Sequence, residues 1–184
     1  EIRLPSNNPD DFSLNIAFVI DYSNSMEDND PNYLFKTLSK NFVDALRTGQ
    51  DKAAVIKFIA SATTVSYLTS DKGQLKFAID SITYDSGYNY DSGTNGSAGL
   101  YSALDILASS QSGYKYIVFL TDGEDNRSSY SYDYITQRAK AENVIIYAIG
   151  MGSAKEDVQL GRSDARGRYC LLPLCQVRGH RHAI

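Results

Sequence analysis

Short apolar runs that stop abruptly at polar residues or glycine constrain the fold of this chain more than any other feature. Residues 14–20 read LNIAFVI and stop at Asp21, and residues 116–120 read YIVFL and stop at a Thr-Asp-Gly turn. A third run, residues 144–149, stops at Gly-Met-Gly. Runs of this length with few polar interruptions are typical of strands buried on both faces, so they predict the centre of a parallel sheet.

Helical patterns fill the gaps between the apolar runs. One helix is expected from Asp30 as N-cap and Pro31 as first helical residue to Gly49, with the acidic run EDND at residues 27–30 as its solvated start. Other helices are expected at 71–82, 97–109 and 132–142. Residues 53–59 and 63–68 are two strands joined so closely that only a hairpin fits, which makes the second antiparallel. This order predicts a doubly wound, Rossmann-like α/β fold: a mostly parallel sheet with one antiparallel edge strand and helices on both faces.

Composition divides the chain into three parts. We expect residues 1–13 to be an N-terminal extension, residues 14–152 to be one domain and residues 153–184 to be an atypical tail. The net charge is −7 over residues 1–152 and +3 over residues 153–184, and both cysteines and both histidines lie in the tail. This break predicts that a frameshift or truncation removed or replaced the C-terminal strand and helix. Because the first residue is Glu1 and not Met, we also expect a longer parent protein.

Charge, hydropathy and cysteine spacing argue against three classes of function. A net charge of −4 disfavours a nucleic-acid partner, because phosphate binding needs a basic face. No stretch approaches the roughly 20 apolar residues that cross a bilayer, so direct membrane insertion is not expected. Cys170 and Cys175 have no second Cys or His pair at the spacing of a zinc site.

Side chains with hard oxygen atoms gather where the expected strands end. The first strand is followed by Asp21, Ser23 and Ser25 (DYSNS), a long loop delivers Thr94 (GTN), and a later strand is followed by Asp122 (TDG). In open α/β sheets the ligand crevice lies beyond the carboxyl ends of the strands. Hydroxyls with one or two carboxylates suit Mg²⁺, and Mn²⁺ or Ca²⁺ are alternatives. The aspartates could instead cap turns, which is the usual role of an isolated aspartate at a strand end.

These three motifs together resemble the metal ion-dependent adhesion site (MIDAS) of von Willebrand factor type A domains and integrin I domains. The resemblance covers residues 14–152 and implies that the hydroxyls of Ser23, Ser25 and Thr94 contact the metal. It implies that Asp21 and Asp122 act directly or through water, and that a carboxylate of a partner protein supplies the last ligand. Asn24 stands where the family usually has glycine; asparagine tolerates left-handed backbone, so we expect the turn to be kept.

The surroundings of the expected metal predict a partner-binding rim. Tyrosine is enriched at protein interfaces, although most tyrosines are ordinary half-buried surface residues. A charge next to the Thr-Asp-Gly turn could select or repel partners. The rim residues are Tyr22, Asn24, Tyr88, Tyr90 and Glu124.

The sequence favours a non-enzymatic, metal-dependent adhesion or protein-interaction module. A structural scaffold in a larger complex is an alternative with the same site and a different partner. A magnesium-dependent hydrolase is disfavoured: His180 and His182 lie in the tail, so no general base is expected beside Ser23 or Ser25, and no phosphate-binding glycine-rich loop is present. We expect an extracellular or cell-surface location, with the cytoplasm as the alternative; the oligomeric state is left open.

Overall fold

Six strands form one sheet in the order β3-β2-β1-β4-β5-β6. The computed structural model describes residues 12–85, 93–110, 113–123, 125–151 and 170–172. Neighbouring strands are parallel except β2 and β3, so the predicted doubly wound sheet with one antiparallel edge strand is confirmed. The strands are β1 (Leu14–Asp21), β2 (Lys52–Phe58), β3 (Ala62–Thr69), β4 (Tyr114–Thr121), β5 (Val144–Gly150) and β6 (Cys170–Leu172).

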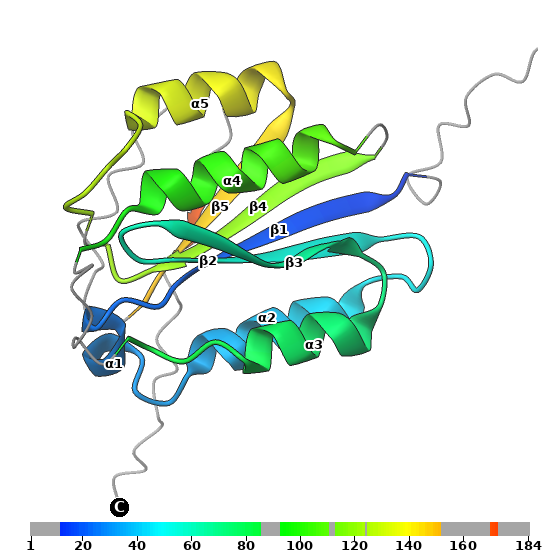
Figure 1. Cartoon of the computed structure of the whole chain (residues 1–184). Coiled ribbons are helices and arrows are strands. Elements are labelled where there is room, and N and C mark those ends of the chain that lie inside the picture. The colour runs from blue at the N-terminus through cyan, green and yellow to red at the C-terminus, as the bar shows by residue number, and fades with distance from the viewer. Residues whose placement is uncertain (1–11, 86–92, 111–112, 124, 152–169, 173–184) are drawn as a thin grey trace, which may run out of the picture.

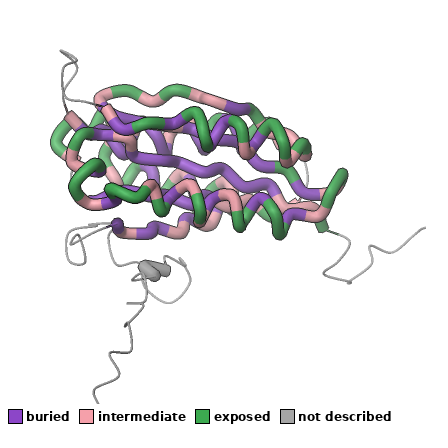
Figure 2. The backbone as a smooth tube through the Cα atoms, turned by 90° about the horizontal axis from the view of Figure 1, so that it is seen from below, coloured by how far each residue is buried: buried purple, intermediate pink, exposed green. Residues whose placement is uncertain are grey.

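Helices cover both faces of the sheet, with α4 and α5 on one side and α2 and α3 on the other (Figure 1). The described helices are α1 (Ser25–Asn29), α2 (Leu34–Ala45), α3 (Lys72–Asp80), α4 (Gly96–Ala108) and α5 (Tyr132–Ala141). Figure 2 shows the strands as buried segments between helices whose outer faces are exposed. None of the described helices is long and apolar enough to cross a membrane.

Strand β1 shows why the apolar runs are nearly unbroken. Phe18 and Ile20 pack into the core cluster on the α2 and α3 side, whereas Ala17 and Val19 pack into the cluster on the α4 and α5 side. All four side chains are fully buried. Because successive side chains of a strand point to opposite faces, a strand covered on both faces needs apolar residues at nearly every position.

Helix α4 lies close against β1 and β2 because one of its residues has no side chain. A Cβ atom on Gly99 would lie 2.7 Å from Val19 Cγ1 and 3.0 Å from Phe58 Cδ1. Both contacts are with fully buried core residues. The glycine therefore sets the distance between α4, which follows Thr94, and the centre of the sheet.

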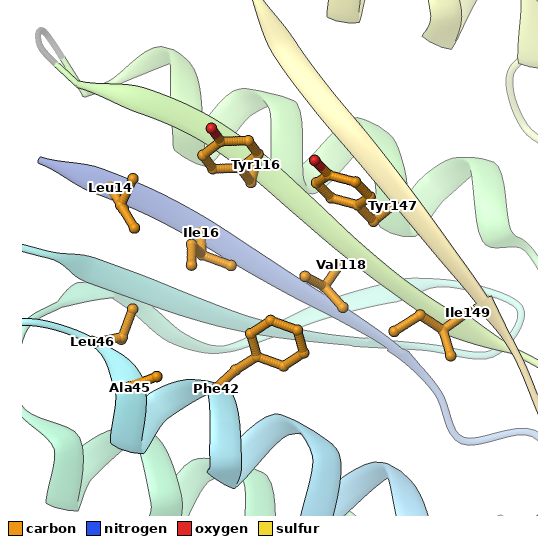
Figure 3. A pocket seen from close by; sticks show the side chains of 9 residues that line it. All are labelled: Leu14, Ile16, Phe42, Ala45, Leu46, Tyr116, Val118, Tyr147 and Ile149. Atoms are coloured by element: carbon orange, nitrogen blue, oxygen red, sulfur yellow. The ribbon is translucent and has the colours of Figure 1, made fainter. Parts of the chain in front are cut away.

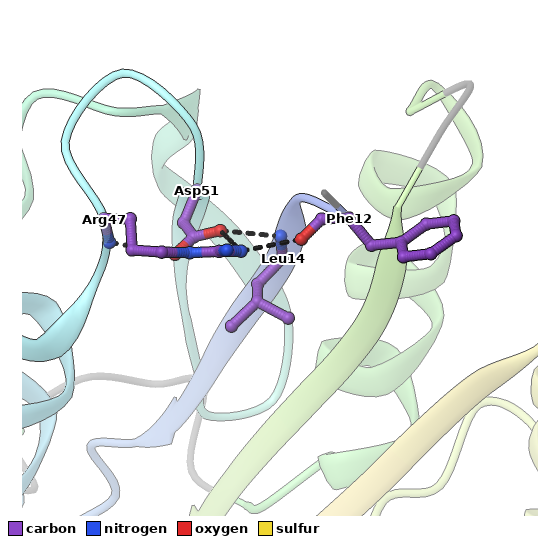
Figure 4. A network of polar contacts seen from close by, with 4 residues as sticks. All are labelled: Phe12, Leu14, Arg47 and Asp51. Atoms are coloured by element: carbon purple, nitrogen blue, oxygen red, sulfur yellow. Dashed lines mark hydrogen bonds and ion pairs between the residues drawn. The ribbon is translucent and has the colours of Figure 1, made fainter. Parts of the chain in front are cut away.

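A buried carboxylate ties the end of α2 to the start of β1 (Figure 4). Asp51 Oδ1 accepts hydrogen bonds from Leu14 N and Arg47 Nη2, both at 2.8 Å. Its Oδ2 accepts from Arg47 N at 2.8 Å and from Arg47 Nε at 2.9 Å. Hydrogen bonds from the arginine side chain, aided by those from the two backbone amides, lower the pKa of Asp51 to about 2. The carboxylate is therefore charged, paired and saturated with donors.

The predicted start of the first long helix is wrong by three residues. Helix α2 begins at Leu34, after Tyr33 in a left-handed conformation with φ of 52°, and not at Pro31. Asp30 still belongs to the end of α1, because its backbone N donates a hydrogen bond to Met26 O at 2.8 Å, so α2 can begin only after a short connection. The Asp30 carboxylate still accepts hydrogen bonds from two free backbone amides at the start of α2, Leu34 N at 2.7 Å and Phe35 N at 3.0 Å.

The part of the expectation that the C-terminal strand is missing is wrong, because β6 is present at the edge of the sheet. That this strand replaces the original one stays a prediction. Residues Cys170–Leu172 pair in parallel with β5, so that Tyr147 lies opposite Cys170 and Ile149 opposite Leu172. The outer edge of β5 would otherwise present unpaired backbone groups, which any extended segment can satisfy whatever its side chains. The expected loss of the closing helix concerns residues 153–169 and 173–184, which lie outside the described residues, as do residues 1–11.

An apolar groove of about 450 Å³ lies between α2 and the neighbouring face of β1, β4 and β5. In Figure 3 its floor is aliphatic, and Tyr116 and Tyr147 stand beside each other on β4 and β5. None of the five candidate metal residues lines it. The lining residues are Leu14, Ile16, Phe42, Ala45, Leu46, Tyr116, Val118, Tyr147 and Ile149.

Candidate metal centre

Asp21 stands at the carboxyl end of β1 and is completely buried. Its Oδ1 accepts a hydrogen bond from Ser23 N at 2.9 Å, and its Oδ2 accepts one from Thr121 Oγ1 at 2.8 Å. Burial away from water raises the pKa of Asp21 to about 7, and the nearby charge of Asp122 also raises it. A cation beside this carboxylate would replace the lost hydration and favour the charged form.

The short helix α1 brings Ser25 next to Ser23. Their hydroxyl oxygens lie 3.1 Å apart, and Met26, the residue that follows, is fully buried and fastens α1 to the core. Asn24 has φ of −59° and ψ of −36°, which is right-handed helical backbone. The turn is kept as expected, but the proposed reason is wrong: α1 starts directly after Asn24, so no left-handed residue is needed there.

Asp122 follows β4, the neighbour of β1, and is 4% exposed. Its Oδ2 accepts a hydrogen bond from Asn29 Nδ2 at 3.1 Å, and the same nitrogen donates to Ser25 O at 3.2 Å. Gly123, with φ of 97°, lets the chain turn sharply after Asp122. Asp21, Ser23, Ser25 and Asp122 thus belong to one connected set of hydrogen-bonded residues at this edge of the sheet.

Thr94 is buried and is held against the loop that follows Asp122. Thr94 N donates to Asn126 Oδ1 at 2.9 Å, while Thr94 O accepts from Asn126 N and Arg127 N, both at 3.1 Å. The described contacts therefore link Thr94 to the site through its backbone and the β4–α5 loop.

Asn95 holds the Thr94 segment from its other side. Its backbone N donates to Ile59 O at 2.7 Å, and its Nδ2 donates to Ala60 O at 3.1 Å and Ser129 Oγ at 2.7 Å. Its Oδ1 caps α4 by accepting from Ala98 N at 3.0 Å. Asn95 is not among the site residues predicted from the motifs, although an asparagine directly before an expected helix is a recognisable capping signal.

The donor types at this edge fit a small, hard divalent cation. Three hydroxyls and two carboxylates come from three separate segments, and all are oxygen donors. Within the described ranges, no group of three or more His, Cys, Asp or Glu side chains could hold a metal. The hydroxyls of Ser23, Ser25 and Thr94 and the carboxylates of Asp21 and Asp122 are the oxygen donors that the sequence offers here.

Only part of the predicted rim can be placed. Tyr22 is half-buried, and the ammonium of Lys57 lies 4.5 Å from the centre of its ring, which turns this side chain toward the end of β2. Asn24 is exposed beside Ser25. Tyr88, Tyr90 and Glu124 lie outside the described residues, so their place on the rim stays a prediction.

A model of the von Willebrand factor type A domain matches residues 15–166. The chain belongs to this family. Among curated proteins, an uncharacterized protein of Borreliella burgdorferi is 34% identical over 149 residues, which cover 77% of this chain and 41% of that protein. The chain therefore spans less than half the length of that relative.

Several solved structures share the fold of this chain. Proximal thread matrix protein 1 from the mussel byssus, with a zinc-occupied MIDAS motif, is 33% identical with a TM-score of 0.65 over 76% of this chain and 36% of that one. A von Willebrand factor type A protein of Catenulispora acidiphila is 21% identical, with a TM-score of 0.65 and coverages of 76% and 33%. BatB of Bacteroides thetaiotaomicron is 23% identical, with a TM-score of 0.63 and coverages of 74% and 66%.

Proposed function

We propose that this von Willebrand factor type A domain is a divalent-cation-dependent protein-interaction module that binds a carboxylate of its partner through Mg²⁺. The observation that carries the proposal is the convergence of two buried aspartates and two serine hydroxyls at the adjoining ends of β1 and β4. The related mussel protein, whose MIDAS motif contains zinc, supports a divalent cation at the corresponding motif.

Each donor has a distinct part in this proposal. The hydroxyls of Ser23, Ser25 and Thr94 hold the cation, and Asp21 and Asp122 balance its charge directly or through water. Two aspartates leave the bound cation with little surplus negative charge around it. The cation supplies Lewis acidity for one more oxygen ligand, and an Asp or Glu side chain of a partner protein fits that role.

The same residues favour binding over catalysis. The hydroxyl of Ser23 lies beside that of Ser25, and a nucleophilic serine needs a neighbouring general base. The described residues include no histidine that could act as this base. We propose a location outside the cell, as for an adhesion module, and a scaffold role in a larger assembly is the second candidate because it uses the same site.

Calorimetric titration of Mg²⁺ and Mn²⁺ into the cation-free protein tests the site. The proposal predicts saturable binding that Asp21→Ala and Thr94→Ala abolish. Asp133→Ala and Thr37→Ala, on exposed positions of α5 and α2, are matched controls that should bind like the parent protein. Folded protein without cation binding, or binding that survives both site substitutions, would refute the proposal.

The carboxylate part has its own test. A peptide with a single glutamate should bind the Mg²⁺-loaded protein more tightly than the same peptide with glutamine, and chelation of the cation should remove the difference. Equal binding of the two peptides would favour the scaffold role.

A further inference from the structure

Asn29 joins two of the segments that carry candidate metal ligands. It is the last residue of α1 and is half-buried. Its amide nitrogen donates to Asp122 Oδ2 at 3.1 Å and to Ser25 O at 3.2 Å. A side-chain amide has two donor hydrogens, so these two contacts use both of them.

This link matters because α1 is too short to be stable alone. Isolated helices need about 12 to 15 residues, whereas α1 has 5. Met26 fastens α1 to the hydrophobic core, and Asn29 fastens its far end to the residue that follows β4. Movement of Ser25 relative to Asp122 is therefore restrained by Asn29.

The amide also restrains Asp122 without adding charge. A carboxylate at position 29 would place a further acidic group beside Asp122, whose charge already acts on Asp21. Sites with more carboxylates and looser geometry favour Ca²⁺, which accepts 6 to 8 oxygen ligands, whereas Mg²⁺ requires near-octahedral geometry. The neutral Asn29 amide, which holds Asp122 in place, therefore suits a site for Mg²⁺ better than a site for Ca²⁺.

We propose that Asn29 is a positioning residue that gives this site its preference for a small divalent cation such as Mg²⁺ over Ca²⁺. The inference rests on the proposed function, since it concerns the same site. Asn29 belongs to none of the three motifs that identified the site. Its role follows only from its two hydrogen bonds, one of which spans 93 positions of the chain.

The test compares Mg²⁺ and Ca²⁺ affinities of the parent protein, Asn29→Ala and Asn29→Asp by calorimetry at one pH and ionic strength. Loss of a residue that orients a metal ligand weakens affinity by about 10- to 100-fold. Asn29→Ala should weaken Mg²⁺ binding by at least about 10-fold and Ca²⁺ binding by much less. Asn29→Asp should raise Ca²⁺ affinity relative to Mg²⁺. Asn41→Ala, an exposed asparagine on α2, is the matched control and should change neither.

The ratio of the two affinities separates positioning from a general effect on folding, because loss of folded protein lowers both affinities equally. Cation-free melting curves show which variants are folded at the assay temperature, and Asn29→Ser replaces Asn29→Ala if the latter is not. Folded Asn29 variants with the parent Mg²⁺ to Ca²⁺ ratio would overturn this inference and leave the proposed function intact. Absence of cation binding in the parent protein would overturn both.

Discussion

Replacement of Asp51 by asparagine should destabilise the domain in a way that depends on pH. The Asp51 side chain is 1% exposed and its pKa is lowered from 3.8 to about 2. Each pKa unit corresponds to about 1.4 kcal/mol, so the charged form contributes roughly 2 kcal/mol to stability. Asparagine also turns an NH₂ group toward the arginine donors, so we expect a total loss of about 2 to 4 kcal/mol at pH 7.

The sign of the pH dependence follows from the lowered pKa. The contribution is present in full above the unfolded-state pKa of 3.8 and is lost as the pH falls through about 2. Urea unfolding at several pH values should therefore give a difference between parent and Asp51→Asn that shrinks between about pH 4 and pH 2.

A second ion pair provides the control for this prediction. Asp80, whose side chain is 51% exposed, pairs with Lys40 at 2.7 Å. Asp80→Asn should cost less than about 1 kcal/mol, because exposed pairs contribute little. The reasoning is refuted if Asp51→Asn and Asp80→Asn have the same effect at pH 7, or if Asp51→Asn keeps the acid sensitivity of the parent protein.

Two further substitutions test the hydrogen bond from Thr121 to Asp21 and the packing of α4 against the sheet. Thr121→Val removes the donor to buried Asp21 and should lower the free energy of unfolding by about 1 to 3 kcal/mol, measured by urea unfolding; an unchanged midpoint would contradict it. Gly99→Ala puts a methyl group within 2.7 Å of Val19 and should cost about 1 to 3 kcal/mol despite the better helix propensity of alanine. A melting temperature equal to or above that of the parent protein would show that α4 can move away from the sheet.

The central sheet could be predicted because burial on both faces leaves a direct mark on the sequence. The apolar run before Asp21 forms β1, as predicted. The hairpin of β2 and β3 could be predicted because few residues separate the two strand patterns. The candidate ligands could be placed at strand ends for the same reason. Asp21 and Asp122 follow neighbouring parallel strands, so their proximity follows from the strand order.

Short elements and distant contacts could not be predicted from local patterns. Helix α1 has five residues, fewer than two turns, and its acidic sequence resembled the solvated start of the next helix. The bonds from Asn29 to Asp122 and from Thr121 to Asp21 join residues 93 and 100 positions apart. The sequence shows which side chains can donate, but only the packed sheet shows which acceptors they reach.

Anomalous diffraction from crystals grown with Mn²⁺ shows directly whether a divalent cation binds at the proposed site. We expect one strong manganese peak at the ends of β1 and β4, with the hydroxyls of Ser23, Ser25 and Thr94 at coordination distances of about 2.0 to 2.3 Å. Ordered crystals at saturating Mn²⁺ without a peak there would contradict the proposed cation site. A peak confined to exposed acidic side chains such as Glu27 and Asp28 would contradict it equally.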